Sequence, residues 1–213
     1  LLQKFIYISS CSVYDTADFN YSIDETSSCG NFLNGYSQSK YEAEQVVLSH
    51  ESKSQKIVLR PHVIYGAMDK KIIPRLLRAY RFNRFVILGK GNNTISITHI
   101  DNLCLAIKNS IETEEEFKSE IFNVTDMEPV KINILMNHIK KKFNIQVKNL
   151  YIPTKIAFLI GITFEKIFKI LSVRKAPFLS KYIVHQMTSN HCISINKAKN
   201  MLKYTPTKSF VDF

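Results

Sequence analysis

The sequence predicts an α/β fold built on a parallel sheet. Short runs of β-branched and aromatic residues alternate along the chain with longer segments whose apolar residues recur every three or four positions. This alternation is typical of strand–helix–strand units, because parallel strands need long crossover connections that are usually helices. The length of 213 residues and the apolar fraction of 45% allow one substantial core and suit a globular chain.

The individual elements follow from the same periodicity. Strands are expected at residues 4–10, 56–60, 85–88 and 119–124. Helices are expected at residues 36–49, 71–82, 101–112, 131–143, 154–171 and 195–202. The acidic run from Glu112 to Glu116 follows one of these helices and is predicted to be a solvated loop.

The first predicted strand ends in a cluster of hydroxyl side chains that includes Ser9 and Ser10. The following helix is predicted to begin near Tyr36, and Lys40 lies on the same face one turn later. A phenol is a weak base at neutral pH, but a nearby ammonium group favours its deprotonated form. The ammonium can also donate hydrogen bonds to the ribose hydroxyls of a nicotinamide cofactor. A serine, a tyrosine and a lysine in this arrangement therefore suit hydride-transfer chemistry on an alcohol or a ketone.

The spacing Tyr-x-x-x-Lys occurs three times in the chain, so the spacing alone is a weak signal. The other two pairs are Tyr151 with Lys155 and Tyr204 with Lys208. Each has a proline two residues after the tyrosine, which excludes that pair from a helix interior. Only Tyr36 begins a run free of proline and glycine. Each residue alone also fits an ordinary surface or loop position, but their order, spacing and flanking elements together favour a site.

Six segments of the chain, including the two just described, occur in the order that is found in one large group of proteins. They are Phe5–Tyr14, Tyr36 with Lys40, Ile57–Gly66, Ile97–Ala106, Ile121–Thr125 and Lys197–Pro206. Through these segments nearly the whole chain resembles the extended short-chain dehydrogenase/reductase superfamily. Within that superfamily it resembles the NAD-dependent epimerase/dehydratase family, and the 3β-hydroxysteroid dehydrogenase-like branch is favoured.

The resemblance implies a Rossmann-like doubly wound parallel sheet and a smaller, mixed α/β substrate-binding lobe. Residues 1–60 would form the C-terminal part of the NAD(P)-binding domain, and residues 98–118 would return to it. Residues 61–97 and 119–213 would form the substrate-binding lobe. Members of this group begin with a glycine-rich turn for the cofactor phosphates, and the six glycines here do not form that pattern. We therefore expect an N-terminally truncated fragment, which by itself binds the dinucleotide poorly and folds marginally.

The resemblance also assigns roles to individual residues. Tyr36 would be the acid/base, Lys40 would favour its phenolate and hold the ribose, and Ser10 would orient the substrate. The expected cofactor contacts are Ser9, Tyr36, Lys40, Pro61 and Val63, and the expected substrate contacts are His62, Ile64 and Tyr65. The cofactor is NAD or NADP. For His62 two roles stay open, a proton relay or a simple hydrogen bond to the backbone.

Two departures from the group bear on the substrate. Ile95 stands where the nucleotide-sugar epimerases carry an arginine that helps to hold the diphosphate, and isoleucine offers no charge-assisted donor. Cys11 and Ser12 stand where the 4,6-dehydratases carry an Asp-Glu pair. Both departures favour an oxidoreductase that interconverts an alcohol and a ketone or aldehyde, on an apolar, sterol-like or small carbonyl substrate. The alternatives are a nucleotide-sugar epimerase of the same superfamily and a non-catalytic cofactor-binding scaffold.

The segment 154–171 is apolar beyond one helical face. The stripe with helical spacing contains Ile156, Leu159, Ile160, Thr163, Phe164, Ile167, Phe168 and Leu171. Its lysines argue against a span through a bilayer, which needs about 20 uninterrupted apolar residues. Three interpretations stay open: a core helix, a hydrophobic lid over an apolar substrate, and an interfacial helix that makes peripheral membrane contact.

The net charge of +11 would suit a nucleic-acid partner, but stacking aromatics are not interleaved with the basic residues and no nucleic-acid motif occurs. We therefore expect a small-molecule substrate and no nucleic acid. The four scattered cysteines predict reduced thiols, and together with the histidines they offer no metal-ligand spacing. The expected location is the cytoplasm, with membrane association and a homodimer left open.

Overall fold

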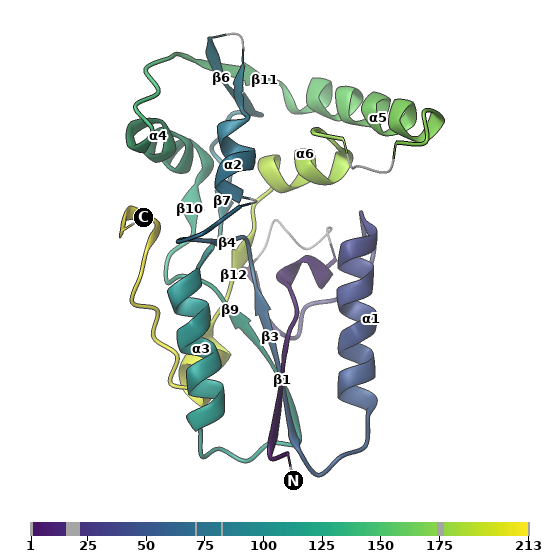
Figure 1. Ribbon diagram of the computed structural model, residues 1–213, viewed down its shortest axis with the longest axis vertical. Coiled ribbons are helices and arrows are strands. Elements are labelled where there is room, and N and C mark those ends of the chain that lie inside the picture. The colour runs from purple at the N-terminus through teal and green to yellow at the C-terminus, as the bar shows by residue number, and fades with distance from the viewer. Residues whose placement is uncertain (1, 16–21, 71, 82, 174–176, 213) are drawn as a thin grey trace. The chain divides into compact units, whose positions relative to one another are not determined.

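The computed structural model divides the chain into two compact units, which are described separately. The structure describes residues 2–15, 22–70, 72–81, 83–173 and 177–212. Unit 1 comprises residues 1–72, 96–129 and 191–213, and unit 2 comprises residues 73–95 and 130–190. Strands and helices alternate along the chain (Figure 1), so the predicted α/β class is confirmed.

A three-stranded parallel sheet forms the centre of unit 1. Its order is β1 (Lys4–Ile8), β3 (Gln55–Pro61) and β9 (Ser119–Val124), and Leu59 of the central strand pairs with Ile8 on one side and Phe122 on the other. Helices α1 (Gly35–Ser49) and α3 (Ile100–Glu112) lie on opposite sides of this sheet (Figure 1). Six consecutive residues of β3 are buried, as expected for a strand covered on both faces.

Side-chain caps set where the two helices of unit 1 begin. The Asn34 side chain accepts a hydrogen bond from Ser37 N at 2.8 Å, which starts α1 just before Tyr36. The His99 imidazole accepts from Asp101 N at 3.2 Å and starts α3. The α1 cap therefore determines which residues occupy the first two turns of the helix.

The rest of unit 1 consists of short elements. They are the 3-10 turn η1 (Cys11–Val13), β2 (Ser22–Ile23), β4 (Ile64–Tyr65), β8 (Thr98–His99), β12 (Cys192–Ile193), α7 (Asn196–Met201) and the turn η3 (Phe210–Asp212). Strand β4 pairs with β8 and β12 pairs with β2, all in parallel. Ala198, Leu202 and Tyr204 belong to the core cluster that also contains Ile57 and Phe122.

This core explains where the unit boundary differs from the expected domain boundary. The sequence analysis expected residues 61–97 and 119–213 in one lobe. The structure instead groups 61–72, 119–129 and 191–213 with unit 1. The reason is that β9 is hydrogen-bonded to β3, and the segment around α7 is packed into the same core.

Unit 2 is built from two small sheets and four helices. The elements are α2 (Ile72–Leu77), β5 (Tyr80–Arg81), β6 (Arg84–Leu88), β7 (Thr94–Ile95), β10 (Val130–Lys131), α4 (Ile132–Lys142), β11 (Asn149–Ile152), α5 (Thr154–Ile170) and α6 (Lys181–Thr188). Strand β6 is central in one sheet, parallel to β11 and antiparallel to β5, and β7 and β10 form an antiparallel pair.

Two sequence-based boundaries were wrong. The helix expected at 71–82 ends at Leu77, because Tyr80 turns back to pair with Phe85 and Asn83 adopts a left-handed φ of 55° in between; residues 71 and 82 lie outside the described residues. The strand expected at 4–10 ends at Ile8, because the next residues form η1. Helix α6 was not predicted.

Helix α5 buries only part of its apolar surface. The buried residues are Ala157 and Gly161, whereas Leu159 of the apolar stripe is 65% exposed. A Cβ added to Gly161 would lie 3.1 Å from the backbone carbon of Ser180, so α6 begins against the backbone of α5. Ile160 of the stripe packs against the core cluster of unit 2 that contains Ala157, so the interpretation as a core helix holds for part of α5 and the outer part of the stripe stays exposed.

Candidate active site

The site begins at the carboxyl end of β1. Ser9 follows the strand directly, and its backbone N donates to Leu59 O at 2.7 Å. Ser10 caps η1, since its Oγ accepts from Ser12 N at 3.2 Å. Because β1 and β3 are parallel, their carboxyl ends meet at one edge of the sheet. Ligands of open α/β sheets bind at this edge.

Helix α1 brings Lys40 to the same edge. Lys40 Nζ donates to Ile8 O at 2.9 Å and lies 5.0 Å from the centre of the Tyr7 ring. Tyr36 lies one helical turn earlier, and its side chain is 54% exposed. Lys40 and Ser10 therefore both lie at the carboxyl end of β1, and Tyr36 is accessible one turn before Lys40 on the same helix.

A buried ion pair fixes α1 to the sheet. Arg60 of β3 donates to both carboxylate oxygens of Glu44, from Nε at 2.9 Å and from Nη2 at 2.6 Å. The two side chains are 3% and 0% exposed. Tyr36, Lys40 and Glu44 follow one another at intervals of four residues, so this bidentate contact holds the face of α1 that carries Tyr36 and Lys40 in register with the end of β3.

The loop after β3 is strained. Pro61 is the last residue of the strand and pairs with Val124. Val63 has a φ of 44°, a left-handed conformation that is a genuine outlier for a β-branched residue. Such strain costs about 1–3 kcal/mol and persists where the surroundings impose it. Here Thr98 imposes it, since its Oγ1 lies 2.7 Å from His62 O and its backbone N donates to Val63 O at 3.2 Å.

Three uncharged polar atoms at this edge are buried and have no hydrogen-bond partner among the described residues: Ser9 Oγ, Ser12 Oγ and His62 Nε2. An unpartnered buried polar atom costs about 1–3 kcal/mol and needs an explanation. Burial lowers the pKa of the His62 imidazole to about 4, so the ring is neutral at pH 7. It stacks on His191, with ring centres 5.4 Å apart. A hydrogen-bonding ligand at this edge is one explanation for such atoms.

These residues fit the nicotinamide end of a dinucleotide. The three unpartnered atoms suit an amide or a carbonyl, and Lys40 keeps two further N–H donors beyond its bond to Ile8. The glycine-rich turn for the phosphates is absent from the 213-residue sequence. Within the described residues no group of three or more His, Cys, Asp or Glu side chains is placed to hold a metal ion.

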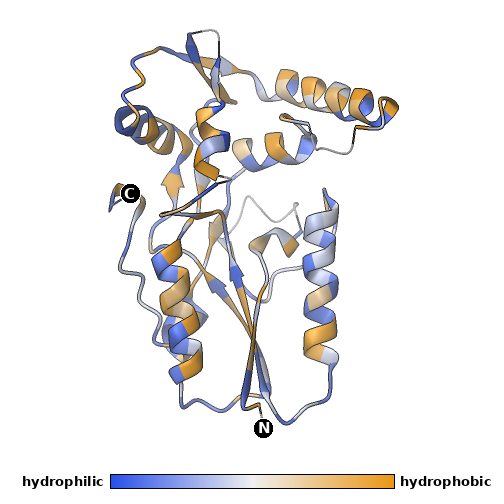
Figure 2. Ribbon diagram, viewed as in Figure 1, coloured by the Kyte–Doolittle hydropathy of each residue, from blue (hydrophilic) through white to orange (hydrophobic). Residues whose placement is uncertain are grey.

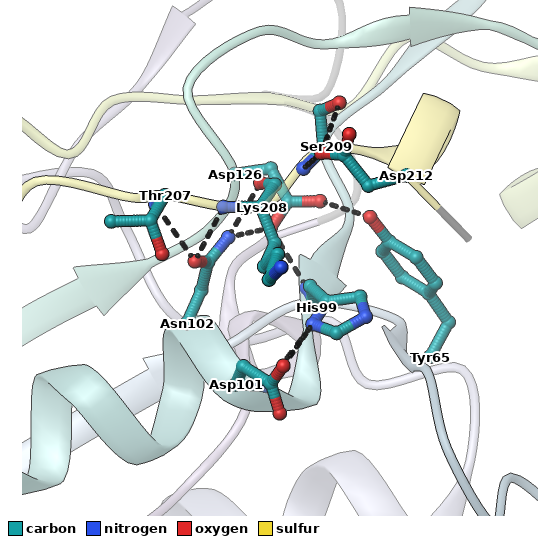
Figure 3. Close-up of polar contacts among 9 residues, drawn as sticks. All are labelled: Tyr65, His99, Asp101, Asn102, Asp126, Thr207, Lys208, Ser209 and Asp212. Carbon is teal, nitrogen blue, oxygen red and sulfur yellow. Dashed lines mark hydrogen bonds and ion pairs between the residues drawn. The ribbon is translucent and has the colours of Figure 1, made fainter.

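The other two residues that the sequence predicts to contact the substrate, Ile64 and Tyr65, pack against other residues of unit 1. Ile64 packs against the core cluster of unit 1. Tyr65 is 2% exposed, and its hydroxyl donates to Asp126 Oδ2 at 2.7 Å (Figure 3). Burial, followed by this hydrogen bond, raises the pKa of Tyr65. The structure thus places Tyr65 beneath the strained loop, where it supports the loop rather than facing solvent.

Asp126 joins the loop to α3 and to the C-terminal segment (Figure 3). Its Oδ1 accepts from Asn102 Nδ2 at 2.7 Å and from His99 N at 2.8 Å. Asn102 Oδ1 in turn accepts from the backbone N of Lys208 at 3.1 Å. Burial raises the pKa of Asp126, although its hydrogen bonds oppose the shift.

Sequence reasoning did not single out Ser12, Glu44 or Asp126 as parts of the site. Glu44 could have been found, because it continues the Tyr36–Lys40 face by one more turn. Asp126 follows a predicted strand, which is a weak signal for a polar site. Ser12 occupies a position of the dehydratases' Asp-Glu pair, but its burial could not be foreseen because it depends on the turn that η1 makes.

The model of the NAD dependent epimerase/dehydratase family matches residues 2–125. A 2-alkyl-3-oxoalkanoate reductase of Shewanella oneidensis is 24% identical over 217 residues, which cover 96% of this chain and 56% of that protein. A 3beta-hydroxysteroid-dehydrogenase/decarboxylase isoform 1 of Arabidopsis thaliana is 27% identical over 219 residues, covering 96% and 50%. The chain thus spans about half the length of these relatives.

Solved structures share the fold. A UDP-glucuronic acid 4-epimerase from Bacillus cereus in complex with NAD superposes with a TM-score of 0.71 at 20% identity. The match covers 98% of this chain and 58% of that one. This likeness confirms the Rossmann-like α/β fold that the sequence predicts.

Proposed function

Because the chain belongs to the NAD-dependent epimerase/dehydratase family, we propose that the whole protein is an NAD(P)-dependent oxidoreductase. It would interconvert an alcohol and a ketone or aldehyde. The observation that supports the proposal is the edge of the unit 1 sheet, where Lys40 is bonded to the end of β1 just before Ser9 and Ser10, and Tyr36 is exposed one turn before Lys40 on the same helix.

In this proposal Tyr36 exchanges a proton with the substrate oxygen. The charge of Lys40 favours the phenolate, and its free N–H donors hold the ribose hydroxyls of the cofactor. Ser10 Oγ already accepts from Ser12 N, so its own hydrogen remains available for the substrate oxygen. When bound, the nicotinamide supplies or accepts the hydride. Ser9, Pro61 and Val63 form the cofactor side of the site, and His62 and Ile64 the substrate side.

An apolar or small carbonyl compound is the proposed substrate. Ile95 is 5% exposed and lies in β7, so this position offers no donor to a diphosphate. The reductase and sterol dehydrogenase names of the relatives point the same way. Sterol-like compounds and 3-oxo acids are therefore the first substrates to try. We assign the cofactor-facing residues to unit 1, and most of the substrate-binding lobe to unit 2.

The second candidate is a nucleotide-sugar epimerase. It is favoured by solved neighbours that contain UDP-glucuronic acid and NAD, and by the arginines of unit 2, which could hold phosphate. A non-catalytic cofactor-binding scaffold is a third candidate. A cytoplasmic location and a homodimer belong to the same proposal.

The test is the Tyr36→Phe substitution in the whole protein. We expect turnover to fall by roughly 10²–10⁴-fold, because the proton exchange is lost, while cofactor binding is retained. Tyr41→Phe is the matched control, since Tyr41 is on the same helix and its ring packs against Phe32. Unchanged turnover in Tyr36→Phe would remove this residue from the role.

The substrate panel distinguishes the candidates. Cofactor oxidation with ketones or 3-oxo acids supports the oxidoreductase. Interconversion of UDP-sugars without net consumption of cofactor supports the epimerase. Tight cofactor binding without turnover of any compound supports the scaffold.

A further inference from the structure

The two units differ strongly in charge. Unit 2 contains 16 of the 29 lysines and arginines and only one of the 18 acidic residues, so its formal net charge is +15. Unit 1 contains the other 13 basic and 17 acidic residues, a net charge of −4. The net charge of +11 therefore belongs entirely to unit 2, whereas the candidate active-site residues lie in unit 1.

Unit 2 also exposes a continuous apolar surface on α5. The α5 face consists of Ile156, Leu159, Phe164, Ile167 and Ile170, which are 51%, 65%, 39%, 41% and 80% exposed. Their spacing places them on one side of the 17-residue helix. Figure 2 shows α5 as predominantly hydrophobic along its length. A soluble monomer rarely leaves a row of large apolar side chains in water without a use for it.

The other side of α5 packs inside unit 2, and this packing leaves the α5 face uncovered. Ala157 and Gly161 are buried there, and the start of α6 lies against the backbone of α5 at Gly161. Glu165, the one acidic residue of unit 2, accepts from Lys181 N at 2.9 Å. The acid is therefore directed toward α6, and the α5 face carries no negative charge of its own.

Basic side chains follow one edge of the α5 face. Lys155, Lys166 and Lys169 are exposed and lie next to it on the helical wheel. Long lysine stems can extend along an apolar surface while their ammonium groups reach a charged layer beside it. An apolar stripe with lysines at its edge is the pattern of a helix that lies in the interface of an anionic bilayer.

We propose that α5 docks unit 2 onto an anionic lipid surface, with the α5 face in the acyl boundary and the three lysines at the headgroups. Among the described residues, none of the helices is long and apolar enough to span a bilayer, so the contact is peripheral. Nucleic acid fits less well, because aliphatic side chains do not stack on bases. A second copy also fits less well, because pairing two α5 faces brings together two units of net charge +15.

The experiment is co-sedimentation of the full-length protein with vesicles. Two compositions are compared, phosphatidylcholine alone and phosphatidylcholine mixed with phosphatidylglycerol. We expect binding to the anionic vesicles only, and weaker binding as the salt concentration rises. The inactive Tyr36→Phe variant should bind equally well, because the docking is independent of the proposed catalysis.

Two sets of substitutions locate the contact. Replacing Lys155, Lys166 and Lys169 by Gln should weaken binding to anionic vesicles by roughly a hundredfold, since each lysine near the surface contributes about 1 kcal/mol. Leu159→Gln with Ile170→Gln should weaken it by about tenfold or more through lost apolar burial. Ile111→Gln is the control, because Ile111 is 59% exposed on α3 of unit 1. All replaced side chains are exposed, and an unchanged melting temperature verifies that the fold is intact.

Several outcomes would overturn the proposal. One is the absence of vesicle binding by the full-length protein. Another is binding that the α5 substitutions leave unchanged, which would place the contact elsewhere. A dimer that Leu159→Gln dissociates, without any vesicle binding, would identify a second copy as the occupant, and binding of single-stranded nucleic acid by the same residues would identify that partner instead.

Discussion

Units 1 and 2 differ in which charged and apolar groups they bury and which they expose. Unit 1 encloses its most important charges, since Arg60 and Glu44 are paired in the core directly below the candidate site. Unit 2 leaves its charges and the α5 face at the surface. The proposed catalysis would therefore depend on buried geometry that salt barely affects, and the proposed lipid docking on surface charge that salt screens. Substitutions in the two units should differ in size and in salt dependence.

The largest effect is expected from breaking the buried pair of unit 1. Glu44→Gln leaves the Arg60 guanidinium buried without its counter-charge, which should lower the free energy of unfolding by about 3–5 kcal/mol. Urea unfolding of the whole protein followed by circular dichroism measures it. Glu42→Gln is the matched control, because Glu42 is exposed on the same helix and bonds only Gln38 there. Equal losses in both variants would contradict the role of the pair.

A pH-dependent effect of up to roughly 3 kcal/mol is expected from His62. The folded imidazole has a pKa of about 4, below the ordinary 6.5, because it is buried. Between these values the unfolded state binds more protons, so this contribution is complete above pH 6.5 and is lost as the pH falls toward 4. In His62→Gln the melting temperature should therefore fall less steeply over this interval. His50→Gln, at an exposed position, should keep the slope of the parent protein.

In unit 2 the packing of α5 gives a smaller effect. Gly161→Val adds a side chain whose Cβ lies 3.1 Å from the Ser180 backbone, so α6 must move, at a cost of about 1–3 kcal/mol. Gly35→Val is the control at a helical glycine where an added Cβ meets nothing within 4 Å. Thermal unfolding compares the two. A stable Gly161→Val protein would show that α5 and α6 need not approach this closely.

The smallest effect is expected at a surface ion pair of unit 1. Lys108 Nζ and Glu112 Oε1 are 3.9 Å apart on α3, and both side chains are about two-thirds exposed. Lys108→Gln should change the free energy of unfolding by less than about 0.5 kcal/mol, and salt should remove even that difference. Urea unfolding at low and high salt tests this. A loss comparable to that of Glu44→Gln would remove the distinction between buried and exposed charge.

Much of unit 1 could be predicted because its signals are local. The periodicity of α1 and the apolar run of β3 depend on neighbouring residues only, and they placed Tyr36 and Lys40 correctly on one helix. The end of α2 could not be predicted, because Tyr80 pairs with Phe85 only once the hairpin has formed. The sequence pattern of α5 shows an apolar stripe and further apolar residues beside it. Which side of the helix is buried depends on how closely α6 approaches Gly161. The roles of Ser9, Ser10, Tyr36, Lys40 and His62 remain predictions.

The division of unit 1 into three separated segments has a consequence for synthesis. The second part of unit 2, residues 130–190, is continuous in sequence and is therefore synthesised without interruption by unit 1. In contrast, β2 acquires its partner β12 only when Cys192 and Ile193 have emerged, and Asn102 Oδ1 accepts its hydrogen bonds from the backbone N of Thr207 and of Lys208. Until then β2 presents an unpaired edge, which is open to wrong pairing with other chains. Unit 1, which carries the candidate catalytic residues, is therefore completed after unit 2.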